Sequence, residues 1–468
     1  TALDAEGNHT AYAIGQIFLC ACIVTVPRQT GIADPGDFGV LLQKFCRQPS
    51  ISAQNVGMRE MVDLIRQEMG AIGVTPDVVE TSGNPILYAE IPGRNQDRTL
   101  SFYNHYDVQP VEPLEEWHSD PFAAEIRDGK LYARGATDNK GSLLSRLCAV
   151  KAFQAVYGQL PLNVKFIYEG EEEIGSVHLS EFAQKYPERL KTDGFAWEGG
   201  SKQLNGPLEV CFGVKGLLFI ELRCRTANSD LHSSNAAIVK NPAWRLVHAL
   251  ATMKDERDHI TIDGFYDNVK APTEYEMHCL ETLQFKEEET KQRMGLDGFV
   301  NGLTGIPLLK KFYYEPTANI AGFKAGYLGE GAKTVEPGSA VVKMDLRLVP
   351  DQTPEEILEK VRAHLDKRGF TDIEVVRLSG EPPFRANPEC LFAKTVVKCV
   401  KPVYGMDPEV FVSSSGTTAM YQFCHAANLD AVMFGAGNDA SNIHAPNENI
   451  ILEDYINAIK MAATVMAE

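Results

Sequence analysis

Four glutamates crowd into one short segment of the chain, where their carboxylates could act together. The segment reads Glu169-Gly-Glu-Glu-Glu173-Ile-Gly-Ser176 and follows residues 162–168, whose branched and aromatic side chains predict a strand. Like charges this close cost free energy unless water solvates them, protons neutralise them or a cation holds them. Taken alone, such a cluster is typical of a solvated turn. Its interpretation depends on what the other loops of the chain offer.

Four further segments present possible metal ligands just after strand-like runs. The residues concerned are His105 and Asp107 in His-Tyr-Asp, Asp138 in a glycine-bounded turn, Glu198 in Trp-Glu-Gly-Gly, and His444 in His-Ala-Pro. Sites in open α/β sheets gather outside the carboxyl ends of the strands, which is where these loops are expected. Each also has an ordinary interpretation: a strand end, a helix cap in the case of Asp138, or a surface histidine.

The side chains offered by these loops favour particular metals. Two histidines with several carboxylates suit zinc, manganese or cobalt better than magnesium or calcium, which prefer oxygen ligands alone. A ligating imidazole usually gives its other N–H to a carboxylate, a role that fits Asp107 beside His105. Two metals about 3.5–4 Å apart, bridged by a carboxylate, form a hydrolytic centre. We therefore expect two divalent ions, zinc first, with manganese or cobalt as alternatives.

Hydrophobic periodicity predicts two kinds of structure for the chain. Strands alternate with helices in the regions that carry the candidate ligands, which indicates an α/β layer with a mixed, mostly parallel sheet flanked by helices. Between them lies a different pattern, a βα…βαβ series typical of an α+β, ferredoxin-like unit. Its predicted elements are strand 217–225, helix 242–253, a poorly patterned section 255–335, strand 340–348, helix 354–368 with Thr353 as N-cap, and strand 372–378.

These patterns divide the 468 residues into a domain with an insertion. A chain of this length is too long for one ordinary core. We expect an N-terminal extension over 1–36, a catalytic domain formed by 37–213 and 387–468, and an inserted domain over 214–386. The apolar run 13–24 is too short to span a bilayer, and the acidic residues before it are unlike a secretory signal.

Composition and charge exclude several classes of partner. The net charge of −18 argues against a nucleic acid or an anionic membrane as the binding partner. Ten cysteines are scattered without a C-x-x-C pair, as in a cytoplasmic protein with reduced thiols, so we expect neither a disulfide framework nor a structural zinc knuckle.

Taken in order, the motifs resemble those of the di-zinc metallopeptidase family of carnosinase-type and cysteinylglycine dipeptidases, glutamate carboxypeptidases, aminoacylases and succinyl-diaminopimelate desuccinylases. The resemblance runs from about residue 37 to the C-terminus. It rests on His105-x-Asp107-x-x-Pro110, Gly135-x-x-Asp138-x-Lys140-Gly141, Glu172-Glu173-x-Gly175-Ser176 and the late His444.

The resemblance implies a role for each residue of the centre. His105 and Glu198 would bind one metal, Glu173 and His444 the other, and Asp138 would bridge the two. Asp193 stays open as an alternative to Glu198, because family members differ between Asp and Glu here. Asp107 would orient His105, and the Asp138-Asn139 peptide is a candidate for a cis bond. Glu172 would be the general base that takes a proton from the bridging water and passes it to the leaving amine. Glu169 and Glu171 have no implied role and keep the solvated-turn interpretation.

The family's inserted domain is a lid through which its members form homodimers, and five residues of this chain match its substrate contacts. His232 in Asp-Leu-His-Ser would stabilise the oxyanion in the partner's active site. Arg347 would grip the substrate carboxylate, for which a guanidinium fork is suited. Gly416 and Thr417 would contact the same carboxylate, although the chain departs here from the dipeptidase pattern. Asn319 is a further substrate-contact candidate.

We therefore expect a cytoplasmic, homodimeric di-metal hydrolase that cleaves an amide bond next to a free carboxylate. A dipeptidase is the first interpretation, with a small peptide as substrate. An N-acyl-amino-acid deacylase or a carboxypeptidase with the same metal centre is the second. A non-catalytic relative is the rival from another class, and retention of the base, the ligands and His232 counts against it. A thiol-dependent hydrolase lacks a cysteine paired with a catalytic histidine motif.

Overall fold

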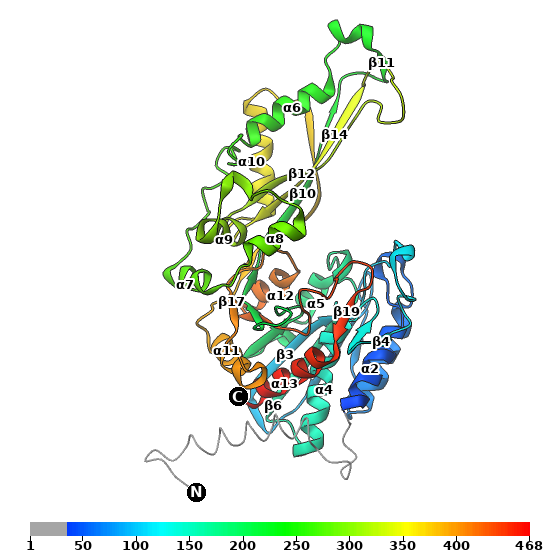
Figure 1. Ribbon diagram of the computed structural model, residues 1–468, viewed down its shortest axis with the longest axis vertical. Helices are drawn as coiled ribbons and strands as arrows, with labels where there is room; N and C mark the ends of the chain where they lie inside the picture. Colours follow the sequence, from blue (N-terminus) through cyan, green and yellow to red (C-terminus); the bar gives the residue numbers. More distant parts are fainter. Residues whose placement is uncertain (1–34) are drawn as a thin grey trace. The chain divides into compact units, whose positions relative to one another are not determined.

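The computed structural model describes residues 35–468 (Figure 1). Apart from its last two positions, the predicted extension over 1–36, with its apolar run, lies outside the described residues. The chain forms two compact units: one contains the residues up to Gly213 with Ala386–Val412 and Gln422–Glu468, the other Val214–Arg385 with Ser413–Tyr421. None of the eight cysteines in the described part takes part in a disulfide, and all but Cys390 are buried.

An eight-stranded mixed sheet lies at the centre of the first unit. Its strand order is β1-β2-β6-β3-β7-β18-β8-β17. The neighbours β6, β3, β7 and β18 run parallel, as do β8 and β17, whereas β1–β2, β2–β6 and β18–β8 are antiparallel. This confirms the predicted α/β class. The strands are β1 (Asp77–Val79), β2 (Ile86–Ile91), β3 (Asn95–His105), β6 (Leu162–Glu169), β7 (Gly194–Trp197), β8 (Glu209–Cys211), β17 (Glu409–Phe411) and β18 (Ala431–Met433).

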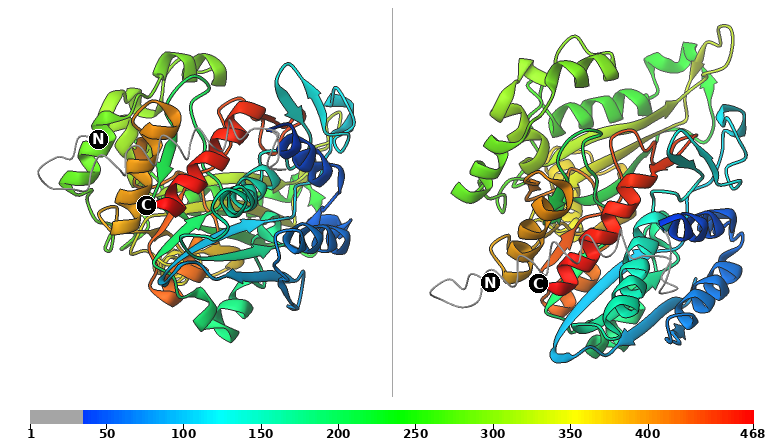
Figure 2. Two further views of the ribbon diagram at one scale, coloured as in Figure 1. Left: turned by 90° about the horizontal axis from the view of Figure 1, so that it is seen from below. Right: turned by 60° about the horizontal axis from the view of Figure 1, so that its bottom comes forward.

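Helices cover both faces of this sheet (Figure 2). Alternate residues of β3 show the two sides: Phe102 lies under Arg146 of α4, and Tyr103 packs against Phe423 of α12 and Trp197. α4 packs against α13 and α2, and α11 packs against α13. The α-helices of the unit are α2 (Pro35–Arg47), α3 (Met58–Gly70), α4 (Lys140–Tyr157), α5 (Leu179–Lys185), α11 (Leu391–Tyr404), α12 (Met420–Ala427, of which the residues from Gln422 onward belong to this unit) and α13 (Leu452–Ala467). A small second sheet joins β4 (Glu125–Arg127), β5 (Lys130–Tyr132) and β19 (Asn449–Ile451).

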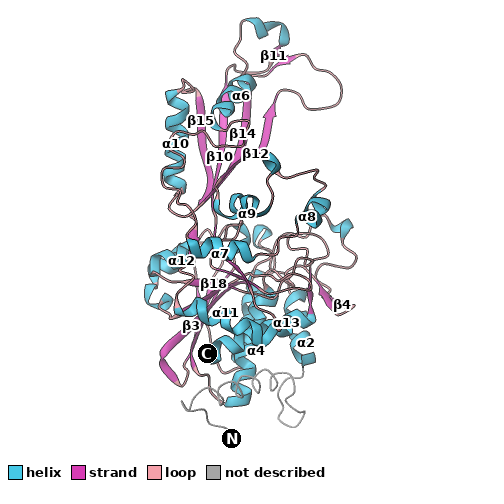
Figure 3. Cartoon of the chain, turned by 60° about the vertical axis from the view of Figure 1, so that its left-hand side comes forward, coloured by secondary structure: helices cyan, strands magenta, loops and turns pink. Residues whose placement is uncertain are grey.

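The second unit is built on a four-stranded antiparallel sheet with two helices on one face (Figure 3). The strand order is β12-β14-β10-β15, and α6 and α10 share one apolar core with the sheet. Thr353 caps α10 by accepting a hydrogen bond from the N–H of Glu356, as predicted. The elements are β10 (Gly216–Arg225), β11 (Leu231–His232), α6 (Pro242–Met253), α7 (Glu274–Thr282), α8 (Glu287–Met294), α9 (Gly305–Tyr314), β12 (Thr317–Ala325), β13 (Val335–Glu336), β14 (Ser339–Leu348), α10 (Pro354–Lys367) and β15 (Ile373–Glu381).

The structure differs from the sequence-based expectation at two places in this unit. The section 255–335 contains the three α-helices α7, α8 and α9 and the edge strand β12, none of which was predicted. In β12 most side chains are exposed and Ala318 is the one buried residue, so no alternation of apolar and polar residues marks the strand. Residues 413–421 were assigned to the catalytic domain, but they pack within the second unit. Ser414 bridges to Val214, and the Thr417 hydroxyl donates to the carbonyl of Lys215.

Candidate metal centre

Three parallel strands of the first unit deliver candidate residues to the same edge of the sheet. His105 is the last residue of β3, Glu172 and Glu173 follow the end of β6, and Glu198 follows the end of β7. Parallel neighbours end side by side, which brings these segments together although up to 93 positions separate the residues. The candidate residues therefore lie at the carboxyl ends of the parallel strands, where the site was predicted from the sequence.

The buried guanidinium of Arg146 ties these strand ends together. From α4 it donates hydrogen bonds to the carbonyls of Tyr103, Trp197 and Phe434 and to the side-chain oxygen of Asn104. A planar fork with five donors can satisfy several fixed carbonyls at once. Arg146 was not predicted as a functional residue from the sequence. The sequence feature that could have indicated its role is a charged residue in the middle of the apolar stretch 143–150.

The carboxylate of Asp138 lies between two imidazoles. Its Oδ1 is 3.1 Å from Nε2 of His105, and its Oδ2 is 3.0 Å from Nε2 of His444. The same nitrogen of His444 is 3.0 Å from Oε2 of Glu173. Potential ligand atoms of His105, Asp138 and Glu173 all lie within 4.8 Å of one another. The peptide between Asp138 and Asn139 is cis, as the resemblance implied.

The side chain of Asp107 is fully buried and contacts both the ring of His105 and the backbone of the glutamate segment. Its carbonyl oxygen and carboxylate Oδ1 lie 3.1 and 3.3 Å from Nδ1 of His105, which leaves Nε2 facing Asp138. Its carboxylate also accepts the backbone N–H groups of Glu172 and Glu173, at 3.3 and 3.1 Å. Asp107 therefore fixes the backbone of the glutamate segment as well as the ring of His105, and only the latter was expected.

The two alternative residues Glu198 and Asp193 lie at opposite ends of β7. Glu198 follows the strand, is buried, and accepts a hydrogen bond of 3.2 Å from the side chain of Asn139. Asp193 precedes the strand, accepts the N–H of Thr99 and has a side chain that is 45% exposed. Because the two residues flank opposite ends of a strand, only Glu198 lies at the edge occupied by Asp138 and His105.

The crowded charges of this cluster shift its protonation strongly. Burial raises the pKa of Glu172 well above its usual value and that of Glu198 to about 7. Burial would lower the pKa of His105, but hydrogen bonds to Asp107 and Asp138 raise it well above its usual value. The pKa of His444 rises to about 10 because Asp138 and Glu173 lie against its imidazole. In the absence of cations, protons on these carboxyl and imidazole groups offset the negative charge of the cluster. Bound cations would take over that role.

The residues present fit a pair of divalent cations. Imidazole nitrogens and carboxylate oxygens are the donor set that zinc, manganese and cobalt accept. The Oε1 atom of Glu173 is buried and has no hydrogen-bond partner among the described residues, although a buried carboxylate oxygen normally has one. A cation would supply the missing partner.

The solvated-turn interpretation of Glu169 and Glu171 is wrong, because both side chains are buried and hydrogen-bonded. Glu169 accepts hydrogen bonds from the hydroxyls of Tyr103 and Ser176. Oε1 of Glu171 accepts a hydrogen bond from the N–H of Asn84 at 3.0 Å. Oε2 of Glu171 lies 2.7 Å from Nδ1 of His178. Both carboxylates therefore anchor the segment that carries Glu172 and Glu173.

Another residue that sequence reasoning missed is Glu448, a fully buried carboxylate close in sequence to His444. It is paired with Arg134 at 2.9 Å and accepts backbone N–H groups from the loop of Asp138. The sequence does not indicate that this glutamate is buried and paired, because every hydrogen-bond partner of its side chain is more than 300 positions away.

The remaining candidates belong to the second unit. His232 is exposed, and its Nδ1 accepts the N–H of Ser234 at 3.1 Å. Arg347 donates to the Thr417 hydroxyl at 2.7 Å, and Gly416 precedes Thr417 in the same loop. The side chain of Asn319 donates to Asp345 at 2.8 Å. Arg347, Gly416 and Thr417 thus come together within the unit, whereas His232 lies at the separate strand β11.

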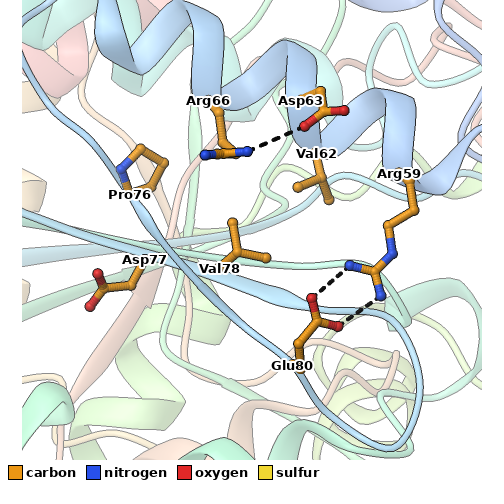
Figure 4. A pocket seen from close by; sticks show the side chains of 8 residues that line it. All are labelled: Arg59, Val62, Asp63, Arg66, Pro76, Asp77, Val78 and Glu80. Carbon is orange, nitrogen blue, oxygen red and sulfur yellow. Dashed lines mark hydrogen bonds and ion pairs between the residues drawn. The ribbon is translucent and has the colours of Figure 1, made fainter.

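A surface pocket between α3 and β1 is distinct from these residues (Figure 4). Its two arginines are already matched by carboxylates: Arg59 makes two hydrogen bonds of 2.7 Å to Glu80, and Arg66 lies 3.4 Å from Asp63. The pocket contains none of the predicted site residues and carries no observed chemistry of its own.

Most of the chain is similar to one family of known proteins. Residues 101–468 match the model of peptidase family M20/M25/M40. The chain belongs to this family of peptidases. The resemblance predicted from the motifs is thereby confirmed.

Relatives within the family cover nearly the whole chain. Beta-Ala-His dipeptidase of Rattus norvegicus is 31% identical over 447 residues, which span 92% of this chain and 88% of that protein. The Cys-Gly metallodipeptidase of Schizosaccharomyces pombe is 25% identical, over 92% and 95% of the two chains.

Solved structures of the family match the fold. An M20 family metallo-carboxypeptidase from Sulfolobus solfataricus superposes with a TM-score of 0.86 and 40% identity, covering 91% of this chain and 97% of that one. Human carnosine dipeptidase 1 gives a TM-score of 0.77 and 27% identity, over 92% and 95%. Among residues 35–468, no helix is both long and apolar enough to cross a bilayer.

Proposed function

We propose that this M20-family peptidase is a di-metal dipeptidase that cleaves the peptide bond next to a free carboxylate. The observation that carries the proposal is the position of the Asp138 carboxylate, with one oxygen facing His105 and the other facing His444. A carboxylate placed in this way can bridge two cations, each of which would have an imidazole of its own.

The chain's own side chains would hold the two ions. His105 and Glu198 would bind the first, Glu173 and His444 the second, and Asp138 both. Zinc is the first candidate, with manganese or cobalt as alternatives. When bound, such a pair polarises the scissile carbonyl and lowers the pKa of the attacking water.

Glu172 is the proposed general base. Its side chain makes no hydrogen bond to any other described residue, while Asp107 holds its backbone N–H. Burial raises the pKa of the Glu172 carboxyl, which makes its carboxylate a stronger base than that of an exposed glutamate. Glu172 would take a proton from the attacking water and deliver it to the nitrogen as the C–N bond breaks, so that the nitrogen leaves as a neutral amine and not as an amide anion.

The second unit would recognise the substrate carboxylate, mainly through Arg347. Gly416, Thr417 and Asn319 are proposed to act beside it. The Thr417 hydroxyl already donates to the Lys215 carbonyl and accepts from Arg347, so its supported role is to hold the guanidinium in place. His232 is proposed to donate to the developing oxyanion, and its exposed side chain leaves Nε2 accessible for such a contact.

We further propose that the protein is a cytoplasmic homodimer joined through the second unit. β12 is an edge strand, and Ile320 and Phe323 on it are 50% and 40% exposed. On α6, Trp244 and Val247 are exposed too. Edge strands and exposed apolar side chains are the features that association buries. The absence of disulfides among the described cysteines supports a reducing compartment.

A carboxypeptidase with the same centre is the second candidate, because the metallo-carboxypeptidase from Sulfolobus solfataricus is 40% identical to the chain. The deacylase alternative needs the same metals and the same Glu172. A panel of dipeptides, longer peptides and N-acyl amino acids, assayed with the zinc-loaded protein, separates the three. Preferred cleavage of dipeptides supports the proposal, whereas cleavage of N-acyl amino acids alone would exclude a dipeptidase.

A further inference from the structure

The buried ion pair of Arg134 and Glu448 connects three loops of the first unit that carry candidate metal ligands. Arg134 precedes the turn of Asp138, and Glu448 follows His444 by four residues. Their side chains are 1% and 0% exposed and lie 2.9 Å apart. A buried ion pair is weak support for stability by itself, so its presence at this position points to a further role.

The carboxylate of Glu448 is saturated by four donors. Oε2 accepts from Arg134 and from the N–H of Gly135 at 3.0 Å. Oε1 accepts the N–H groups of Thr137 and Asp138, each at 3.0 Å. The Glu448 side chain therefore fixes the backbone of the turn that carries Asp138, from the N–H of Gly135 to the N–H of Asp138.

Arg134 contacts the two other loops that carry candidate ligands, those of His105 and His444. Its Nη2 donates to the carbonyl of Pro110 at 3.1 Å, in the loop that follows His105 and Asp107. Its Nη1 also lies 3.4 Å from the carbonyl of Ala445, the residue after His444. The guanidinium and the carboxylate together thus contact the loops of His105, Asp138 and His444.

We propose that Glu448, through Arg134, is the positioning residue that fixes the spacing of the metal ligands Asp138, His105 and His444. This inference rests on the proposed metal centre and adds to it a residue that contacts neither metal nor substrate. Supporting residues of this kind typically contribute 10–100-fold to metal affinity. A merely structural residue would change stability and leave the affinity of the folded protein unaltered.

Two substitutions of Glu448 test the proposal. Glu448→Gln keeps the size but turns an N–H₂ group toward backbone N–H groups or Arg134. Glu448→Asp keeps the charge beside Arg134 and shortens the reach by one methylene. The fold near the loop has support independent of this side chain, since β19 pairs with β5 and the Thr137 hydroxyl donates to the Asn449 carbonyl. Both variants are therefore expected to fold.

The chain offers a matched control in the second unit. Glu276 is also a buried carboxylate with an arginine partner, Arg385, and it also accepts a backbone N–H, that of Thr273. Glu276→Gln should lower the melting temperature without changing metal affinity, because Glu276 belongs to the unit that carries no proposed ligand.

The experiment is zinc binding to the purified full-length chain, measured by competition with a chromophoric chelator, with melting temperature recorded in parallel. We expect both Glu448 variants to bind zinc roughly 10–100-fold more weakly than the wild type. At saturating zinc we expect kcat to fall more than KM rises. Should Glu448→Gln fail to fold, Glu448→Asp and Arg134→Lys, which keep both charges, are expected to show the same direction of change.

Folded Glu448 variants with wild-type zinc affinity would overturn the proposed positioning role and leave the proposed function intact. A wild-type protein that binds no zinc, manganese or cobalt would instead overturn the metal centre and the positioning role with it. The two failures are distinguished by the wild-type measurement alone.

Discussion

The hydroxyl of Thr417 accepts a hydrogen bond of 2.7 Å from the guanidinium of Arg347, although 70 positions separate the two residues. The same hydroxyl donates at 2.7 Å to the carbonyl of Lys215, the residue that precedes β10. Thr417 therefore links the orientation of Arg347 to the backbone of the second unit. An arginine that binds a carboxylate with both arms of its fork needs such support.

Removal of this link should weaken substrate binding. Thr417→Val keeps the shape of the side chain and removes both hydrogen bonds, so Arg347 is free to rotate. We expect KM for a dipeptide to rise about tenfold, as loss of roughly 1.5 kcal/mol in binding implies, with little change in kcat. Steady-state kinetics on the zinc-loaded protein measure both constants.

Thr418→Val is the matched control for this prediction. The Thr418 hydroxyl is buried in the same loop and has no hydrogen-bond partner among the described residues. Its removal should leave KM unchanged and stability equal or higher. Equal KM values for the Thr417 and Thr418 variants would contradict the role assigned to Thr417.

Arg146 is expected to be essential for the stability of the first unit. Arg146→Met would leave the carbonyls of Tyr103, Trp197 and Phe434 buried without a donor. We expect the free energy of unfolding to fall by more than about 3 kcal/mol, because each such group costs roughly 1–3 kcal/mol. Urea denaturation measures this loss. Arg98→Met, at an exposed ion pair with Asp193, should cost less than about 0.5 kcal/mol. A similar cost for both variants would contradict the prediction.

The contrast between Arg146 and the ligands shows how much the sequence could predict. His105, Asp138, Glu173 and His444 were predicted because motif order and strand ends are local features of the chain. Glu448 and Arg146 were missed because their roles depend on contacts with segments far away in the sequence, which no local pattern marks. β12 was missed for a related reason: an edge strand buries too few side chains to impose an alternation on its sequence.

Glu209 gives a pH dependence of stability that is independent of the metal centre. It lies on β8 directly beside Glu409 of β17, and burial together with Asp439 and Glu409 raises its pKa to about 7. A carboxyl with a raised pKa keeps its proton in the folded state while the unfolded chain, with a pKa near 4.5, releases it. Stability from this group therefore falls as the pH rises from about 4.5 to about 7.

Glu209→Gln should remove this penalty. We expect little change in melting temperature at pH 4.5 and an increase above pH 7, equivalent to roughly 1–2 kcal/mol after allowance for solvent screening. Calorimetry across this pH range measures the effect, with Glu115→Gln on the exposed surface as a control that should follow the wild type. A constant difference between Glu209→Gln and the wild type at all pH values would contradict this explanation.

The most direct test of the central claim is zinc titration of the chelator-treated protein, with dipeptide hydrolysis followed at each step. The structure predicts that two ions bind per chain, that hydrolysis returns as they bind, and that Glu172→Gln binds both ions with kcat lowered by about 10²–10⁴-fold. A protein that holds no metal and is indifferent to chelators would contradict this account, and so would a Glu172→Gln variant as active as the wild type.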